Sequence, residues 1–148
     1  MELDAMPMSA ESNLKIEVVD TAIDPKAPRA REVRRRQNEG QRPLYKVWIY
    51  LKGKDLAFVD SVTYTLHKSF GTPVRTVQRS LRNPNCQLII WTWGVFNVGV
   101  SIRDKSGNLY QLVHELAYDS EFRKSEPVVL VDDKEPAVSR PVLYSSAQ

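Results

Sequence analysis

The sequence predicts an all-β protein, an immunoglobulin-like antiparallel β-sandwich of about seven or eight strands. Two observations support this prediction. Short runs of alternating apolar and polar residues recur between residues 44 and 118, and clusters of turn-forming residues separate them. No segment of this block has the 3.6-residue apolar period of a helix. The cysteine pair of antibody domains is absent, because Cys86 is the single cysteine.

The strands can be placed in order along the chain. Alternating or continuous apolar runs predict strands over residues 14–19, 46–52, 62–67, 74–77, 88–93, 96–103 and 110–116. Turn-forming residues separate them at 52–55, 71–73, 83–85 and 104–108. Residues 20–43 have three prolines and no apolar periodicity, which predicts a long loop with a helical turn around residues 29–36. Residues 128–131 are either one more strand or an apolar segment outside the sandwich.

Length and composition predict one domain with extensions at both ends. The 148 residues are 42% hydrophobic and 26% charged, which is typical of a globular protein. We expect a disordered segment over residues 1–12, the sandwich over 13–119, and an extension over 120–148 that is mostly tail. No apolar run approaches the roughly 20 residues that span a bilayer, and the first residues lack the apolar core of a signal peptide. The sequence therefore predicts a cytoplasmic protein without membrane contact.

Few residues could carry catalysis or bind a metal. The chain has two histidines, His67 and His114, and no spacing of His, Cys or carboxylates that is typical of a metal site. A dyad of Cys86 with a histidine is the enzymatic alternative, but Cys86 opens an apolar strand, where a small buried side chain is the simpler interpretation. We predict a protein that is not an enzyme and needs no metal or cofactor.

A basic cluster precedes the central block. Seven Lys and Arg side chains against two Glu between residues 26 and 42 give a local charge of +5. Arginines bind phosphates and carboxylates through charge and paired hydrogen bonds, so Arg34, Arg35 and Arg36 predict weak contact with nucleic acid or an acidic surface. No aromatic residue lies between them, which disfavours stacking on bases. The alternative is a solvated loop.

Two segments resemble a known family. They are YTLHKSFGTPVR at residues 64–75 and WGVFNV at 93–98, with VWIYL at 47–51 and VDSV at 59–62 before them and LVHEL at 112–116 after them. In this order and spacing they resemble YEATS domains over roughly residues 13–119, and the prokaryotic YEATS-like branch more than the eukaryotic chromatin readers. The resemblance implies the immunoglobulin-like sandwich that the strand pattern also predicts. That branch is known mostly from bacterial proteins of multi-component or effector systems.

The resemblance also implies a binding site. Eukaryotic YEATS domains hold an acylated lysine between two loops at one end of the sandwich. Two aromatic rings stack on the acyl-amide, while a hydroxyl and a backbone N–H bind its polar atoms. An acylated lysine has lost its charge, so a neutral slot suits it. The matching positions are the clamp aromatics Phe70 and Trp93, the hydroxyl of Ser69, and the slot-lining His67, Gly94 and Phe96.

Two residues depart from the reader pattern. Thr92 stands where readers have Gly, and Val95 where they have a small or acidic residue; a β-branched side chain at 92 restricts this loop. We hypothesise an interaction domain that reads an acylated lysine on a protein partner. The alternative is an adaptor or scaffold subunit that binds a protein partner without recognising acyl-lysine, in which Phe70, Trp93 and Phe96 are ordinary packing residues. An open slot favours the first, and a slot filled by its own side chains favours the second.

Overall fold

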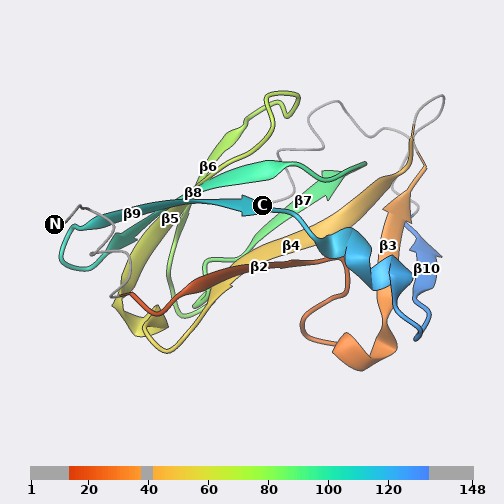
Figure 1. The fold of residues 1–148 in the computed structure, drawn as a ribbon, viewed down its shortest axis with the longest axis horizontal. Helices are drawn as coiled ribbons and strands as arrows, with labels where there is room; N and C mark the ends of the chain where they lie inside the picture. The colour runs from red at the N-terminus through yellow and green to blue at the C-terminus, as the bar shows by residue number, and fades with distance from the viewer. Residues whose placement is uncertain (1–13, 38–41, 134–148) are drawn as a thin grey trace, which may run out of the picture.

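The computed structural model describes residues 14–37 and 42–133, whose strands form two sheets (Figure 1). Five strands make one sheet: β2 (Glu17–Thr21), β3 (Glu32–Arg36), β4 (Leu44–Lys52), β7 (Leu88–Thr92) and β10 (Val129–Asp132). Four make the other: β5 (Val59–Thr65), β6 (Val74–Gln78), β8 (Asn97–Asp104) and β9 (Leu109–Glu115). Short 3₁₀ helices are η1 (Pro28–Ala30), η2 (Leu56–Phe58) and η3 (Tyr118–Arg123). The predicted β-sandwich is confirmed.

Strand β4 is the centre of the five-stranded sheet. Its residues 45–49 pair with β7 along one edge. Along its other edge, residues 48–52 pair with β2 and residues 44–45 pair with β3. Strands β2 and β3 therefore follow one another beside β4, and the segment that contains η1 leaves the sheet between them. The four-stranded sheet has the order β6-β5-β8-β9, with antiparallel pairing throughout.

The core lies between the two sheets and follows the period-2 alternation of the strands. Val47, Ile49 and Leu51 of β4 are completely buried, and so are Val62 and Tyr64 of β5. Alternate residues of a strand point to the same face, so the spacing of these apolar side chains determines which face of each strand is buried. No helix in the part of the chain that the structure describes is long and apolar enough to cross a membrane.

The prediction of a long loop over residues 20–43 is wrong. Glu32–Arg36 form strand β3, and the predicted helical turn is limited to η1. Val33 is completely buried, whereas its neighbours in β3 are charged. A single apolar residue among arginines has no visible alternation, and the strand forms because it pairs with β4 on one edge and with the distant β10 on the other.

One of those partners is the C-terminal extension. Strand β10 pairs in parallel with β3, so of the two alternatives for residues 128–131 the strand is the observed one. Arg35 forms an ion pair with Asp132 (Nη2–Oδ1 2.9 Å), and Arg36 lies 4.0 Å from Asp133. Arg31 donates to the carbonyl of Glu126 (2.8 Å).

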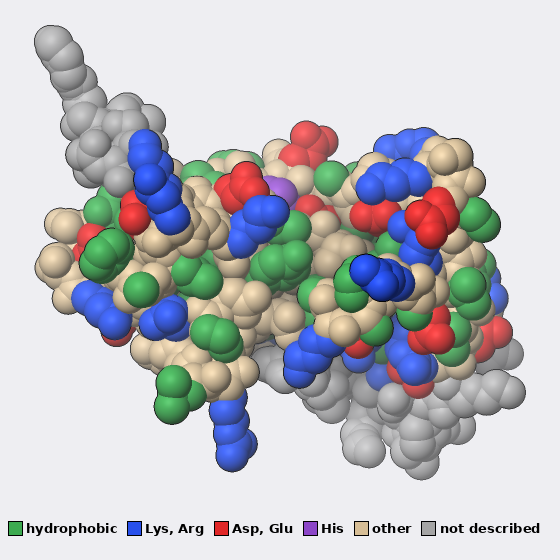
Figure 2. All heavy atoms as spheres, turned by 90° about the horizontal axis from the view of Figure 1, so that it is seen from below, with side chains coloured by type: hydrophobic (Ala, Val, Ile, Leu, Met, Phe, Trp, Pro, Cys, Tyr) green, Lys and Arg blue, Asp and Glu red, His purple; other side chains and the backbone are tan. Residues whose placement is uncertain are grey.

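Basic and acidic side chains are consequently interspersed over the end of the molecule formed by β3, β10 and η3 (Figure 2). The sheet continues beyond residue 119, the predicted end of the sandwich, although the division of the chain into domains stays a prediction. The segments predicted as tails, residues 1–12 and 136–148, lie outside the described residues.

Truncation tests the contribution of the extension to stability. A chain that ends at residue 119 loses the backbone hydrogen bonds from Val129 to Arg31 and from Asp133 to Arg35. The truncation also removes the β3–β10 ladder and the Arg35–Asp132 ion pair. At about 1 kcal/mol each, the two bonds alone set a lower bound of about 2 kcal/mol, or roughly 8 °C in melting temperature for a domain of this size. A chain that ends at residue 133 is expected to melt like the full chain. Equal melting temperatures for the 119 and 133 truncations would contradict a structural role for β10.

Candidate functional site

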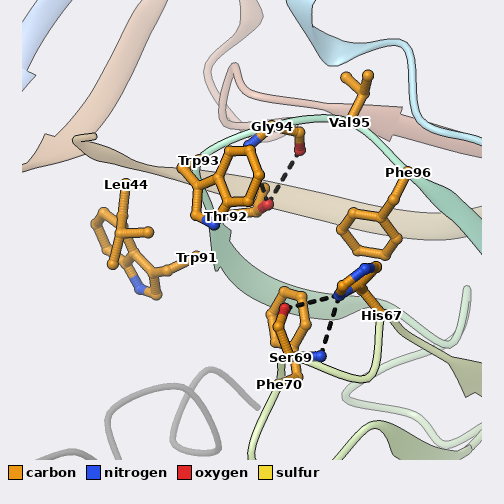
Figure 3. Close-up of a pocket in the computed structure, with 10 residues that line it drawn as sticks. All are labelled: Leu44, His67, Ser69, Phe70, Trp91, Thr92, Trp93, Gly94, Val95 and Phe96. Atoms are coloured by element: carbon orange, nitrogen blue, oxygen red, sulfur yellow. Dashed lines mark hydrogen bonds between the residues drawn. The ribbon is translucent and has the colours of Figure 1, made fainter. Parts of the chain in front are cut away.

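Two loops meet at one end of the sandwich and enclose a cavity of about 190 Å³ (Figure 3). One loop, residues 66–73, joins β5 to β6; the other, residues 93–96, joins β7 to β8. The lining includes all six residues that the resemblance assigns to a slot: His67, Ser69, Phe70, Trp93, Gly94 and Phe96. The structure thus brings together side chains that are up to 29 positions apart in the sequence.

The first loop is organised around His67. The Ser69 backbone N–H and the Ser69 hydroxyl both lie against His67 Nδ1, at 3.0 and 2.8 Å. In the neutral tautomer with its proton on Nε2, Nδ1 is the acceptor and the hydroxyl donates to it. Its oxygen keeps its lone pairs, so it is available to accept a hydrogen bond from a ligand N–H.

Aromatic rings form opposite sides of the cavity. Phe70 and Phe96 have ring centroids 5.6 Å apart, and the His67 and Phe96 rings pack in an edge-type arrangement with centroids 5.9 Å apart. Figure 3 shows the Trp93 ring across the cavity from Phe70. Phe70 and Phe96 also pack against the main core, whereas Trp93 is 53% exposed and belongs to neither core cluster of the described residues. Core packing therefore explains in part why Phe70 and Phe96 are aromatic. It does not explain the aromatic ring at Trp93.

Thr92 fixes the second loop and leaves the slot open. Its hydroxyl donates to the Gly94 carbonyl (3.0 Å), and the Gly94 N–H donates back to the hydroxyl (3.3 Å). The Tyr118 hydroxyl donates to the same carbonyl (3.1 Å). Burial raises the pKa of Tyr118, so its hydroxyl remains a donor. A glycine at position 92 has no side chain and could not form these bonds. The hydroxyl of Thr92 therefore adds two hydrogen bonds that hold the second loop from within.

The sequence analysis did not assign Leu44, Trp91 or Tyr118 to the site; the first two line the cavity, and Tyr118 holds its second loop from η3. Thr92 and Val95, the two departures from the reader pattern, complete the lining. Tyr118 continues the every-second-residue pattern of Tyr110, Leu112, His114 and Leu116, which is the signal that could have identified it as an inward-facing side chain. Nothing in the sequence linked it to Gly94.

The basic segment touches this site from outside the cavity. The Arg42 guanidinium lies over the Trp93 ring (4.9 Å to the centroid), and that of Arg36 lies over Trp91 (3.9 Å). Neither arginine is among the lining residues, and the lining contains no Lys, Arg, Asp or Glu. Cation–π contacts of this kind help to hold a ring in place; Trp91 is buried, whereas Trp93 stays 53% exposed.

The side chains of the enzymatic alternative lie in unrelated surroundings. Cys86 is completely buried, and burial raises the pKa of its thiol to about 11. His67 belongs to the exposed cavity loop, and His114 pairs with the carboxylate of Asp20 (2.7 Å). Over residues 14–37 and 42–133, no group of three or more His, Cys, Asp or Glu side chains is arranged to hold a metal ion.

Residues 45–117 match the family model of the prokaryotic YEATS domain. The chain contains a YEATS domain of this family. It is also 38% identical over 69 residues to transcription initiation factor TFIID subunit 14 of Schizosaccharomyces pombe, a match that covers 45% of this chain and 27% of that protein. The chain thus spans about a quarter of the length of this relative.

The structure resembles the yeast Yaf9 YEATS domain in complex with an H3K122suc peptide, with a TM-score of 0.51. The two chains are 16% identical, and the match covers 73% of this chain and 75% of the other. At this identity the likeness establishes a common fold. The family match includes both cavity loops, whereas Leu44 and Tyr118 fall just outside it.

The environment of Cys86 leads to a prediction about thiol reactivity. A buried thiol with a raised pKa is almost entirely protonated at pH 8, so we expect Cys86 to resist Ellman's reagent in the folded protein and to react at once in denaturant. Absorbance after mixing measures both rates. Rapid labelling of the native protein would contradict the burial of Cys86 and restore interest in a cysteine nucleophile.

Contact of Arg34, Arg35 and Arg36 with a polyanion stays a prediction. Arg35 and Arg36 pair with Asp132 and Asp133, so Arg34→Ala is the variant that leaves those pairs intact. We expect this variant to bind heparin more weakly than the parent, with an affinity that falls steeply between about 50 and about 200 mM salt. Arg103→Ala, on β8, is the matched control. Equal heparin affinity for both variants and the parent would leave β3 without a role in polyanion binding.

Proposed function

We propose that this YEATS domain binds a protein partner by holding an acylated lysine, or a similar flat amide, between Phe70 and Trp93. The observation that supports this most is the open cavity of about 190 Å³ between these rings. It is an order of magnitude larger than the roughly 15 Å³ that a single water needs, so it has room for an acyl group. An open slot is also the feature that favours a reader over an adaptor.

The uncharged lining supports selectivity against unmodified lysine. A lysine ammonium that enters the slot loses its hydration and meets no carboxylate among the lining residues. Removing an ion from water without compensation costs several kcal/mol. Acylation removes the charge, so the acyl-amide enters without that penalty.

The polar groups of the slot suit an amide. The Ser69 hydroxyl, when it donates to His67, can accept the amide N–H of a ligand. Stacking of the amide on aromatic rings is worth about 1 kcal/mol beyond its buried area, and the hydrogen bond adds roughly as much. Affinity for a single modified residue is therefore weak, and residues that flank it must contribute the rest.

The comparisons support a protein as the partner. The Yaf9 YEATS domain recognises an H3K122suc peptide, and the relative in Schizosaccharomyces pombe is a subunit of TFIID. These statements concern those proteins, and their relevance here is by likeness. The alternative remains an adaptor that binds its partner through other surfaces and leaves the slot unused.

Calorimetry with acetylated, crotonylated and unmodified forms of one lysine peptide tests the proposal. We expect both acylated forms to bind and the unmodified form to show no measurable heat. Trp93→Ala should lower the affinity at least about tenfold, because the exposed ring contributes more to the slot than to the core. Phe58→Ala removes an aromatic of similar exposure (59%) from η2 and is the matched control.

Phe70→Ala is a second variant, with a thermal melt alongside because Phe70 also packs on the core. We expect it to abolish binding while the melt stays cooperative. Equal affinities of the parent for the three peptides would reject the reader proposal and leave the adaptor as the better interpretation.

A further inference from the structure

We propose that the groove between β6 and the beginning of β7 is a second binding surface, at which an extended acidic segment of a partner protein adds to the sandwich as a strand beside β6. The groove has a volume of about 880 Å³ and shares no lining residue with the aromatic cavity. It is lined by β6 along its whole length, by the loop that precedes β7, and by Pro25 and Lys26. The proposal does not depend on acyl-lysine binding.

The open edge of β6 provides the hydrogen-bonding groups. Leu66 N donates to Pro73 O (2.7 Å), and Arg79 N donates to Asp60 O (2.9 Å), which identifies the bonded pairs at the two ends of the β5–β6 ladder. Bonded and non-bonded pairs alternate along an antiparallel ladder.

It follows that Arg75 and Val77 bond to β5, whereas Val74, Thr76 and Gln78 direct their backbone N–H and C=O groups away from it. Within residues 14–37 and 42–133, β6 pairs with β5 alone. A row of outward-directed backbone groups is the template on which peptides add as strands.

The charge of the groove indicates what the added strand carries. Lys26, Arg75 and Arg82 line it, and no Asp or Glu does. Arg75 is 6% exposed, its Nε donates to the Thr72 carbonyl, and burial lowers its pKa. A partially desolvated guanidinium gains most from a nearby carboxylate.

Apolar side chains of Val77, Leu88 and Ile89 also line the groove. Arg75 and Val77 are two positions apart in β6 and therefore share one face of the strand. An added segment meets a cation and apolar side chains together on that face, so it needs both acidic and apolar residues.

The rim of the groove is a loop in a fixed conformation. The Asn83 side chain accepts from Gln87 N (2.7 Å) and donates to Gln87 O (3.0 Å), and Arg79 Nε donates to Pro84 O (2.8 Å). Cys86 adopts a left-handed backbone conformation (φ 52°), which is costly for a residue other than glycine. Leu81 lies in the turn closed by the backbone bonds between Ser80 and Asn83, is fully exposed, and precedes Arg82 of the groove lining. An exposed apolar side chain next to a groove gains free energy when a partner buries it.

Binding of a designed peptide tests the proposal in the full chain. The probe is a fluorescein-labelled eight-residue peptide of alternating glutamate and valine, followed by fluorescence anisotropy. Thr76→Pro removes an outward N–H that makes no ladder bond, and edge strands tolerate proline at such positions.

Gln111→Pro is the matched control on the other edge of the same sheet. Leu116 N donates to Phe96 O and Asp104 N to Asn108 O, so Gln111 also directs its N–H outward.

We expect the parent to bind this peptide and to show shifts of the Val74, Thr76 and Gln78 amides by NMR. Thr76→Pro should lower the affinity at least about tenfold, Leu81→Ala and Arg82→Gln about threefold each, and Gln111→Pro and Trp93→Ala not at all. A peptide with lysine in place of glutamate should not bind. Two peptides are N-methylated at alternate residues, one at the glutamates and one at the valines; the one whose methyl groups face β6 should lose binding to the unaltered parent, which tests strand addition even where Thr76→Pro impairs folding.

The proposal is overturned by no binding of the acidic peptide, equal binding of the lysine peptide, full binding by a correctly folded Thr76→Pro variant, or full binding of both N-methylated peptides. A marked gain in affinity on deleting residues 1–13 or 134–148 would also overturn it, since the occupant of the groove would then be a terminus of the same chain. Unchanged binding by Trp93→Ala separates this surface from the acyl-lysine slot, so each proposal can fail without the other.

Discussion

Strand β4 forms ladder hydrogen bonds along both edges, and the arrangement of the five-stranded sheet follows from this pairing. Val47, Ile49 and Leu51 point from β4 into the core, so a slip of one residue against β7 would turn all three toward the opposite face. The same register sets Tyr45 opposite Thr92. It thereby brings Leu44, at the start of β4, to the cavity at the end of β7.

The cavity forms where the chain passes from one sheet to the other. Strand β7 belongs to the five-stranded sheet and β8 to the four-stranded sheet, so the loop that carries Trp93 crosses between the layers. A crossing loop has no neighbouring strand to fix it, and here the hydroxyls of Thr92 and Tyr118 bind Gly94 instead. The opposite wall, with Phe70, lies on a connection within one sheet. The distance between the two aromatic sides therefore depends on how the sheets pack.

Charge is distributed differently over the two proposed surfaces. The aromatic cavity has an uncharged lining, whereas the groove beside β6 is lined by cations alone among its charged residues. They are physically connected, because Arg75 of the groove bonds to the carbonyl of Thr72 in the loop that carries Phe70. One weak site for a modified lysine gains apparent affinity from a second contact on the same partner, since the second binding event is intramolecular. The two surfaces together would suit a partner in which an acidic segment accompanies the modified residue.

The sequence alone determined the sandwich, because alternation and turn residues are local properties that each strand carries by itself. The order and spacing of two short motifs also identified six of the residues that line the aromatic cavity, but neither the opening of the slot nor the role of Thr92 could be predicted from them. Only the tertiary structure decided that the arginine-rich segment is a strand. Val33 is the one buried residue of this strand. Asp132, the acidic partner of Arg35, is 97 positions away in the sequence. The outward edge of β6 and the tether from Tyr118 were decided in the same way, because strand pairing and hydrogen bonds between distant residues depend on how the sheets assemble and leave no local pattern in the sequence.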